Sequence, residues 1–206
     1  KDSCSVEKDS LSITMKTKKG YKIYYTLDGS IPTKKSTRYK KEITLNRYSS
    51  PDQLVLKENK KKMVSNEINI DDNIPRATVL RAVSIAPNGT TGPIETKTYF
   101  IGTDIANYYK NIAVFSLVTD PKNLLDYNTG ILVKGKTYDK WSKTKEGKKV
   151  LKDNVKYEIQ GNFTQKGKEW EREATIELFD GTNSSTWQEN VGIRLKGNKT
   201  RFYSQK

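Results

Sequence analysis

Two glycines and several basic side chains lie close together near the end of the sequence, and residues of these types can bind phosphate. Gly192 and Gly197 allow a ligand to approach the backbone closely. Positive charge comes from Arg194, Lys196, Lys199, Arg201 and Lys206. Phosphoryl transfer needs donors around the phosphates, a Lys or Arg on them, an acidic partner for that cation, and carboxylates for a metal. The pattern indicates a phosphate site; the alternative is that the glycines are turn residues and the basic side chains are solvated.

Glu171 and Glu177 are the candidates for the acidic partner, and the sequence leaves both open. Other kinds of chemistry are excluded by composition. The chain has no His, and Cys4 is its single cysteine, so zinc and other soft metals lack ligands. A Ser-His-Asp or Cys-His nucleophile is excluded for the same reason. We therefore expect no metal site, and any reaction must rest on carboxylates, lysines, arginines and backbone amides.

The charge balance favours an anionic partner. The formal net charge is +14, from 38 basic and 24 acidic residues. Such an excess attracts nucleic acid, teichoic-type polymers, acidic proteins or phosphate. The alternative is a lysine-rich composition spread over the whole surface. No apolar run is long enough to span a membrane.

The first half of the chain shows short strands separated by turn signals, as in an all-β sandwich. Asp28-Gly29 and Asn88-Gly89 are the clearest turns. We interpret Asp28 as a turn residue; the alternative is a sugar or cation ligand. Residues 46–73 lack periodicity and are interpreted as a surface insertion between strands. The expected strands are Leu11–Lys16, Lys22–Leu27, Glu42–Leu45, Thr78–Ala86 and Glu95–Ile101.

The second half is less regular. Asp104 and Asp120 are placed to begin short helices, over 104–109 and 122–125. Ile112–Val118 is nearly all apolar, which predicts a strand buried on both faces. Residues 134–156 are rich in Lys, with Tyr138 and Trp141 interleaved and Tyr157 directly after them. Because these aromatics have no repeat, we expect a mobile surface excursion rather than a single-strand nucleic-acid surface. Further expected strands are Gly130–Val133, Ala174–Phe179 and Asn190–Leu195.

Several of these segments resemble known families. The motifs Y-Y-T-L-D-G-S-I-P-T at 24–33 and V-L-R-A-V-S-I-A-P-N-G at 79–89 resemble the β-sandwich at the C-terminal end of chitobiases. The motifs V-F-S-L-V-T-D-P at 114–121, W-E-R-E-A-T-I-E-L-F-D at 170–180, G-I-R-L-K-G-N-K-T-R at 192–201 and the final Q-K resemble the CotH family, kinase-like proteins related to spore coat protein H. In many CotH proteins such a sandwich precedes the kinase-like part.

The resemblance implies a mainly β chain with two domains. Residues 1–102 are expected to form an antiparallel, immunoglobulin- or fibronectin-like β-sandwich. Residues 103–206 are expected to form the β-rich N-terminal portion of a CotH-like atypical kinase fold of the α+β type. The aspartates that serve catalysis and metal binding in this family lie beyond the last residue. The chain is therefore expected to be truncated within the kinase-like domain, to hold no catalytic residue, and to be inert by itself.

The resemblance also implies a function for the full-length protein. That protein would be a secreted or surface kinase that uses ATP and a divalent metal, Mg or Mn, to phosphorylate a protein. Lys206 falls at the family's Q-K position and is expected to reach the nucleotide phosphates, with Arg201, Gly192 and Gly197 completing the nucleotide-binding set. The expected location is extracellular, at a cell surface or spore coat. The alternative function is an extracellular module that binds carbohydrate or a surface polymer in adhesion.

Overall fold

The computed structural model describes residues 2–51 and 75–202. The insertion expected over 46–73 lies mostly outside the described residues, and Lys206 lies wholly outside them. The chain divides into two compact units. The first unit comprises Lys1–Asp52, Asp72–Val118 and Ala174–Val191. The second comprises Gln53–Asp71, Thr119–Glu173 and Gly192–Lys206.

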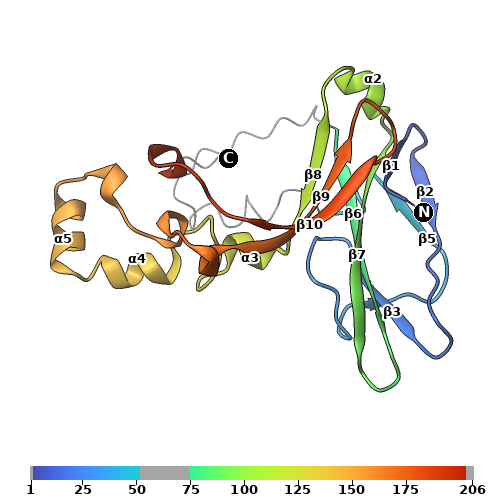
Figure 1. Ribbon diagram of the computed structural model, residues 1–206, viewed down its shortest axis with the longest axis horizontal. Helices are drawn as coiled ribbons and strands as arrows, with labels where there is room; N and C mark the ends of the chain where they lie inside the picture. Colours follow the sequence, from blue (N-terminus) through green and yellow to red (C-terminus); the bar gives the residue numbers. More distant parts are fainter. Residues whose placement is uncertain (1, 52–74, 203–206) are drawn as a thin grey trace. The chain divides into compact units, whose positions relative to one another are not determined.

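Three sheets form the first unit. The largest has the strand order β1-β7-β6-β3-β4, the second pairs β2 with β5, and the third has the order β10-β9-β8 (Figure 1). Most pairs are antiparallel, but β1 pairs with β7 in parallel. The bounds are β1 Cys4–Val6, β2 Ser10–Ile13, β3 Lys22–Thr26, β4 Thr37–Arg38, β5 Ile43–Asn46, β6 Ala77–Ile85, β7 Thr91–Ile101, β8 Val114–Val118, β9 Arg172–Phe179 and β10 Trp187–Ile193. The expected mainly β fold class is confirmed.

The β2–β5 sheet packs on one face of the largest sheet. Alternation places Leu11, Ile13 and Leu45 on the inner side of the small sheet, where they meet Leu80 and Tyr99 of β6 and β7. All five side chains are buried. This apolar layer between two sheets is the sandwich core that the strand pattern predicts.

The third sheet covers the other face of β7. Phe100 points away from the sandwich core and meets Phe179 of β9 edge to face, with the ring centroids 5.4 Å apart. Polar contacts extend this layer, since the Thr98 and Ser116 hydroxyls lie 2.7 Å apart. Gln188 Nε2 also donates to the Thr96 carbonyl at 3.0 Å. The first unit thus includes residues beyond 102. The boundary at residue 102 between the chitobiase-like and CotH-like domains stays a prediction.

The two helix starts predicted from aspartate are confirmed. Helix α2 (Ile105–Tyr109) begins after Asp104, whose carboxylate accepts from the backbone N–H of Asn107. Helix α3 (Pro121–Leu125) begins after Asp120, which accepts from the backbone N–H of Lys122. These bonds satisfy amides that have no partner within the helix. Hydrogen bonds from the backbone N–H of Asn107 and from the Asn183 side chain hold the pKa of Asp104 below its usual value.

Two expectations about the second half are wrong. The β8 strand is not buried on both faces, because Phe115 and Leu117 are 57% and 53% exposed. Gly130–Val133 is not a strand; the backbone N–H groups of Ile131 and Leu132 donate to carbonyls at 123 and 124, folding the segment back onto α3. Residues 134–156, expected to be a mobile surface excursion, contain α4 (Gly135–Trp141) and α5 (Lys145–Lys152); their mobility stays a prediction.

Short 3-10 turns complete the second unit: η2 Lys156–Glu158, η3 Asn162–Thr164, η4 Lys168–Trp170 and η5 Lys199–Phe202. An aromatic cluster holds three of them together. The buried ring of Phe202 in η5 meets Phe163 of η3 and Tyr157 of η2, with centroids 5.2 and 5.5 Å apart. Both contacts are edge to face, the geometry that aromatic quadrupoles favour. The basic run after β10 is therefore anchored on its own unit.

Candidate functional site

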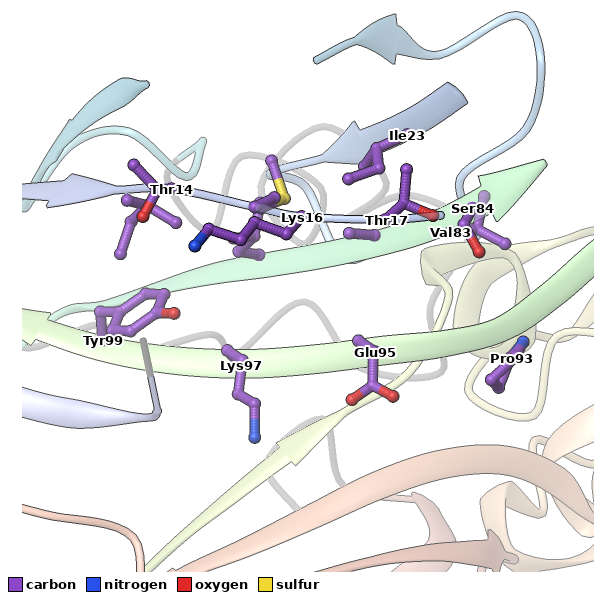
Figure 2. A pocket seen from close by; sticks show the side chains of 14 residues that line it. Thr14, Lys16, Thr17, Ile23, Val83, Ser84, Pro93, Glu95, Lys97 and Tyr99 are labelled. Carbon is purple, nitrogen blue, oxygen red and sulfur yellow. The ribbon is translucent and has the colours of Figure 1, made fainter. Parts of the chain in front are cut away.

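The first unit contains a groove beside β7. The β2 and β5 strands have four residues each, whereas β6 has nine and β7 eleven. The small sheet therefore covers only part of the face that β6 and β7 present. The chain leaves the sheet after Ile13, and residues 14–17 form one wall of a cavity of about 290 Å³. Figure 2 shows this groove between the 14–17 segment and β7.

The groove has an apolar floor and a polar rim. Ile23, Leu80 and Val83 are buried apolar residues beneath it. Thr14, Lys16 and Thr17 line the rim on the segment that follows β2, and Figure 2 shows their side chains beside the cavity. Small-molecule sites commonly combine a mostly apolar lining with a few polar groups that fix orientation. An amphipathic ligand such as a sugar ring matches this combination.

Tyr99 contributes a neutral hydroxyl to the same groove. Burial, with smaller effects from Cys4 and Glu177, raises the pKa of its phenol well above the usual value. The hydroxyl therefore keeps its proton at neutral pH. Lys97 also lines the groove, but its ammonium donates to Gln188 Oε1 at 3.1 Å and lies 3.7 Å from Asp2. Figure 2 shows Lys97 and Glu95 extending away from the 14–17 segment.

A second cavity, of about 440 Å³, lies in the second unit. Its lining includes Gly192 and Arg201, as expected from the sequence, and also Lys166, Arg194 and Lys196. We call it the basic pocket. Arg194 Nε lies 3.4 Å from Glu171 Oε2. A Cβ at Gly192 would collide with the Glu171 carboxyl group, so glycine at this position permits that close packing.

Arg201 has a structural role in the basic pocket. Its guanidinium donates to three backbone carbonyls, of Gly197 at 2.7 Å, Thr164 at 2.9 Å and Gln165 at 3.1 Å. Gly197 has a φ of +116°, a conformation that favours glycine. Arg201 and Gly197 therefore form one bonded turn. This arrangement accounts for both residues without a ligand, as the turn interpretation of the glycines expected.

The two candidate acidic partners lie in different units. Glu171 belongs to the second unit, where it pairs with Arg194. Glu177 belongs to the first unit, where it is completely buried and accepts a hydrogen bond from the Ser3 hydroxyl. Of these two candidates, Glu171 is the one beside the basic pocket, through its ion pair with Arg194. Its pairing with Lys206 stays a prediction, because Lys206 lies outside those residues.

Sequence reasoning missed the groove and part of the basic pocket. Thr14, Lys16 and Thr17 were assigned to a strand or left unassigned, whereas the strand ends at Ile13. Lys166 follows a 3-10 turn that no pattern indicates. Asp28 is confirmed as a turn residue, since its Oδ1 accepts from the backbone N–H and the hydroxyl of Ser30 at 3.0 and 2.6 Å.

The described ranges, 2–51 and 75–202, contain neither a metal-ligand cluster nor a membrane-spanning helix. No group of three or more His, Cys, Asp or Glu residues there is arranged to hold a metal ion. No helix in those ranges has the length and apolar character needed to cross a membrane.

Comparison with known proteins bears on the first half of the chain. No curated protein and no solved structure matches the chain. Residues 5–96 match a family model described as the chitobiase/beta-hexosaminidase C-terminal domain. The predicted resemblance of the sandwich to this domain is confirmed over these residues, and the resemblance of the second half to the CotH family stays a prediction.

Proposed function

We propose that the protein is an extracellular surface module whose sandwich binds carbohydrate in the groove beside β7. The observation that carries this proposal is the groove's combination of an apolar floor with a rim of hydroxyl and ammonium groups. A sugar ring has apolar C–H faces and polar edges, so both parts of the groove have a counterpart on the ligand. The match of residues 5–96 to a chitobiase/beta-hexosaminidase domain supports carbohydrate as the ligand class.

The Lys16→Ala variant is expected to bind chito-oligosaccharides at least tenfold more weakly than the unchanged chain. Lys16 is exposed at the groove rim, so its removal costs a charge-assisted hydrogen bond of about 1.5–3 kcal/mol without disturbing the core. Titration calorimetry on the full chain measures the difference. Lys18→Ala, two residues away, exposed and outside the groove lining, is the matched control. Equal losses in both variants, or no binding by the unchanged chain, would contradict the proposal.

We propose as a second function that the second unit belongs to a CotH-like kinase fold that binds ATP with Mg or Mn and acts on a protein substrate in the full-length protein. Support comes from the basic pocket, where Lys166, Arg194 and Lys196 surround one cavity and Glu171 fixes Arg194. Cations held by an acidic partner suit a phosphate group. A cell surface or spore coat is the location that this function implies.

The Lys196→Gln variant is expected to weaken Mg-ATP binding about tenfold, because one charged contact to a phosphate is lost. Lys168→Gln is the control: Lys168 is exposed in the same unit and does not line the pocket. Both variants lower the net charge by one, so non-specific attraction changes equally. If the two weaken binding equally, or if binding disappears at moderate salt in the unchanged chain, only the overall charge attracts the nucleotide.

A further inference from the structure

Helix α5 carries a row of lysines on one side. Four of its residues, Lys145, Lys148, Lys149 and Lys152, recur at intervals of three, four and seven positions. At about 100° per residue this spacing places all four within one narrow face. We call this face the lysine ridge. Val150 and Gly147 lie on the opposite side and are buried. A Cβ at Gly147 would collide with the Trp141 carbonyl of α4, so this opposite side packs against the end of α4.

The ridge faces solvent in the described part of the chain. The four lysines are exposed, and none makes an ion pair with another described residue. Like charges three and four positions apart destabilise a helix. Lys145 also stands at the first helical position, just after the Thr144 cap, where a positive charge opposes the helix dipole. Lys149 and Lys152 lie in the last turn, where the helix dipole favours a positive charge, so helix stability accounts for those two lysines but not for Lys145 and Lys148.

We propose that the lysine ridge binds a linear, flexible polyphosphodiester of a cell surface, of the teichoic type. The choice of a surface polymer rests on the proposed extracellular function, whereas the anionic chemistry rests on the ridge itself. Neighbouring lysines on one helix face stand about 5–6 Å apart, so a flexible chain can place successive phosphates along them. Lysine is a point charge on a flexible stem, suited to a partner recognised by charge density rather than by fixed geometry.

The surroundings favour such a polymer over nucleic acid. Single-stranded nucleic acid is held by basic residues together with aromatic rings on which bases stack. Next to the ridge Trp141 is buried, and the ring of Tyr138 is covered by Lys134 Nζ, 5.0 Å from its centroid. Tyr157 packs on Phe202 and has Lys199 Nζ 5.4 Å from its centroid; it is 42% exposed, so it is the most open of these three rings. An interfacial membrane helix would need a broad outward apolar face, whereas in α5 Val150 is buried and only Leu151, 39% exposed, is an outward apolar side chain.

The test compares two variants with the same net charge. The ridge variant changes Lys145, Lys148, Lys149 and Lys152 to Gln, and the control changes the exposed Lys18, Lys19, Lys40 and Lys41 of the first unit to Gln. Binding of the full chain to poly(glycerol phosphate) is measured between 50 and 200 mM salt. Loss of about four phosphate contacts should reduce the slope of log K against log salt by about 3. At 50 mM salt we expect affinity to fall at least tenfold in the ridge variant and about twofold or less in the control.

The other outcomes overturn the proposal. No binding by the unchanged chain, or equal losses in both variants, overturns the proposal. Binding to oligo(dT) of equal charge that is more than tenfold tighter assigns the ridge to nucleic acid, and binding only to phosphatidylglycerol vesicles assigns it to a membrane; either result overturns it. Gln has a helix propensity similar to that of Lys, so circular dichroism should show α5 intact.

Binding of neutral chito-oligosaccharides, measured on the same samples, separates the two proposals. The ridge variant should retain it. If the unchanged chain binds the polyanion and no neutral sugar, the proposed carbohydrate function fails and the ridge proposal stands.

Discussion

The Phe179→Ala variant is expected to lose about 3–5 kcal/mol of the free energy of unfolding of the first unit. Phe179 is 1% exposed, lies edge to face on Phe100, and packs in one cluster with Ile105. Truncation would leave a cavity between the third sheet and β7 that rigid strands cannot close. Denaturant unfolding of the full chain, followed by far-ultraviolet circular dichroism, measures the loss.

Phe115→Ala is the matched control for this effect. Phe115 stands on the adjacent strand β8, but on the outer face of the third sheet, where it is 57% exposed. Its truncation removes little buried surface and should cost less than about 1 kcal/mol. Similar losses in the two variants would show that the third sheet does not pack on β7 through Phe179.

Features that depend on neighbouring residues could be predicted from the sequence. The strands of the sandwich follow from apolar alternation between turn signals, as at Thr78–Ala86, observed as Ala77–Ile85. The starts of α2 and α3 follow from Asp104 and Asp120, because a capping carboxylate bonds an amide only two or three residues further on. Such local signals do not depend on how the rest of the chain packs.

Features that depend on what covers a segment could not be predicted. The apolar run at Ile112–Val118 has the pattern of a strand between two layers, yet only one face of β8 is covered. The many lysines of 134–156 favoured a surface excursion and indicated no helix, although Thr144 caps α5 and Val150 supplies a buried contact. A few buried side chains and a cap outweigh composition in so short a helix.

The candidate sites also combine features that the local sequence predicts with features that depend on distant residues. The basic run was recognised from its types and spacing, and Gly192 and Arg201 do line one pocket. The groove brings residues 14–17 beside β7, roughly eighty positions away in sequence, through strand pairing that no local pattern specifies. The sequence also could not show that the Arg201 guanidinium donates hydrogen bonds to the carbonyls of Thr164 and Gln165.

The hydrogen bonds of Arg201 predict the second large effect, a loss of stability on substitution. Arg201→Lys keeps the charge and is still expected to destabilise the second unit by about 2–4 kcal/mol. The planar guanidinium reaches three carbonyls at once, at Gly197, Thr164 and Gln165, and an ammonium on a flexible stem cannot reproduce that fork. The three bonds are part-buried, and a carbonyl left there without its donor costs about 1–3 kcal/mol, partly recovered where water enters.

The measurement is hydrogen exchange on the full chain across residues 156–202, where faster exchange in Arg201→Lys would report opening of the turn that joins η5 to η3. Arg194→Lys is the matched control. Arg194 lines the same pocket, but its contact is a surface ion pair with Glu171, so its replacement should cost less than about 1 kcal/mol. If Arg201→Lys left exchange unchanged and weakened only Mg-ATP binding, Arg201 would be a ligand-binding residue rather than a structural one. The three carbonyl bonds predict the opposite order: faster exchange in Arg201→Lys, and native exchange in Arg194→Lys.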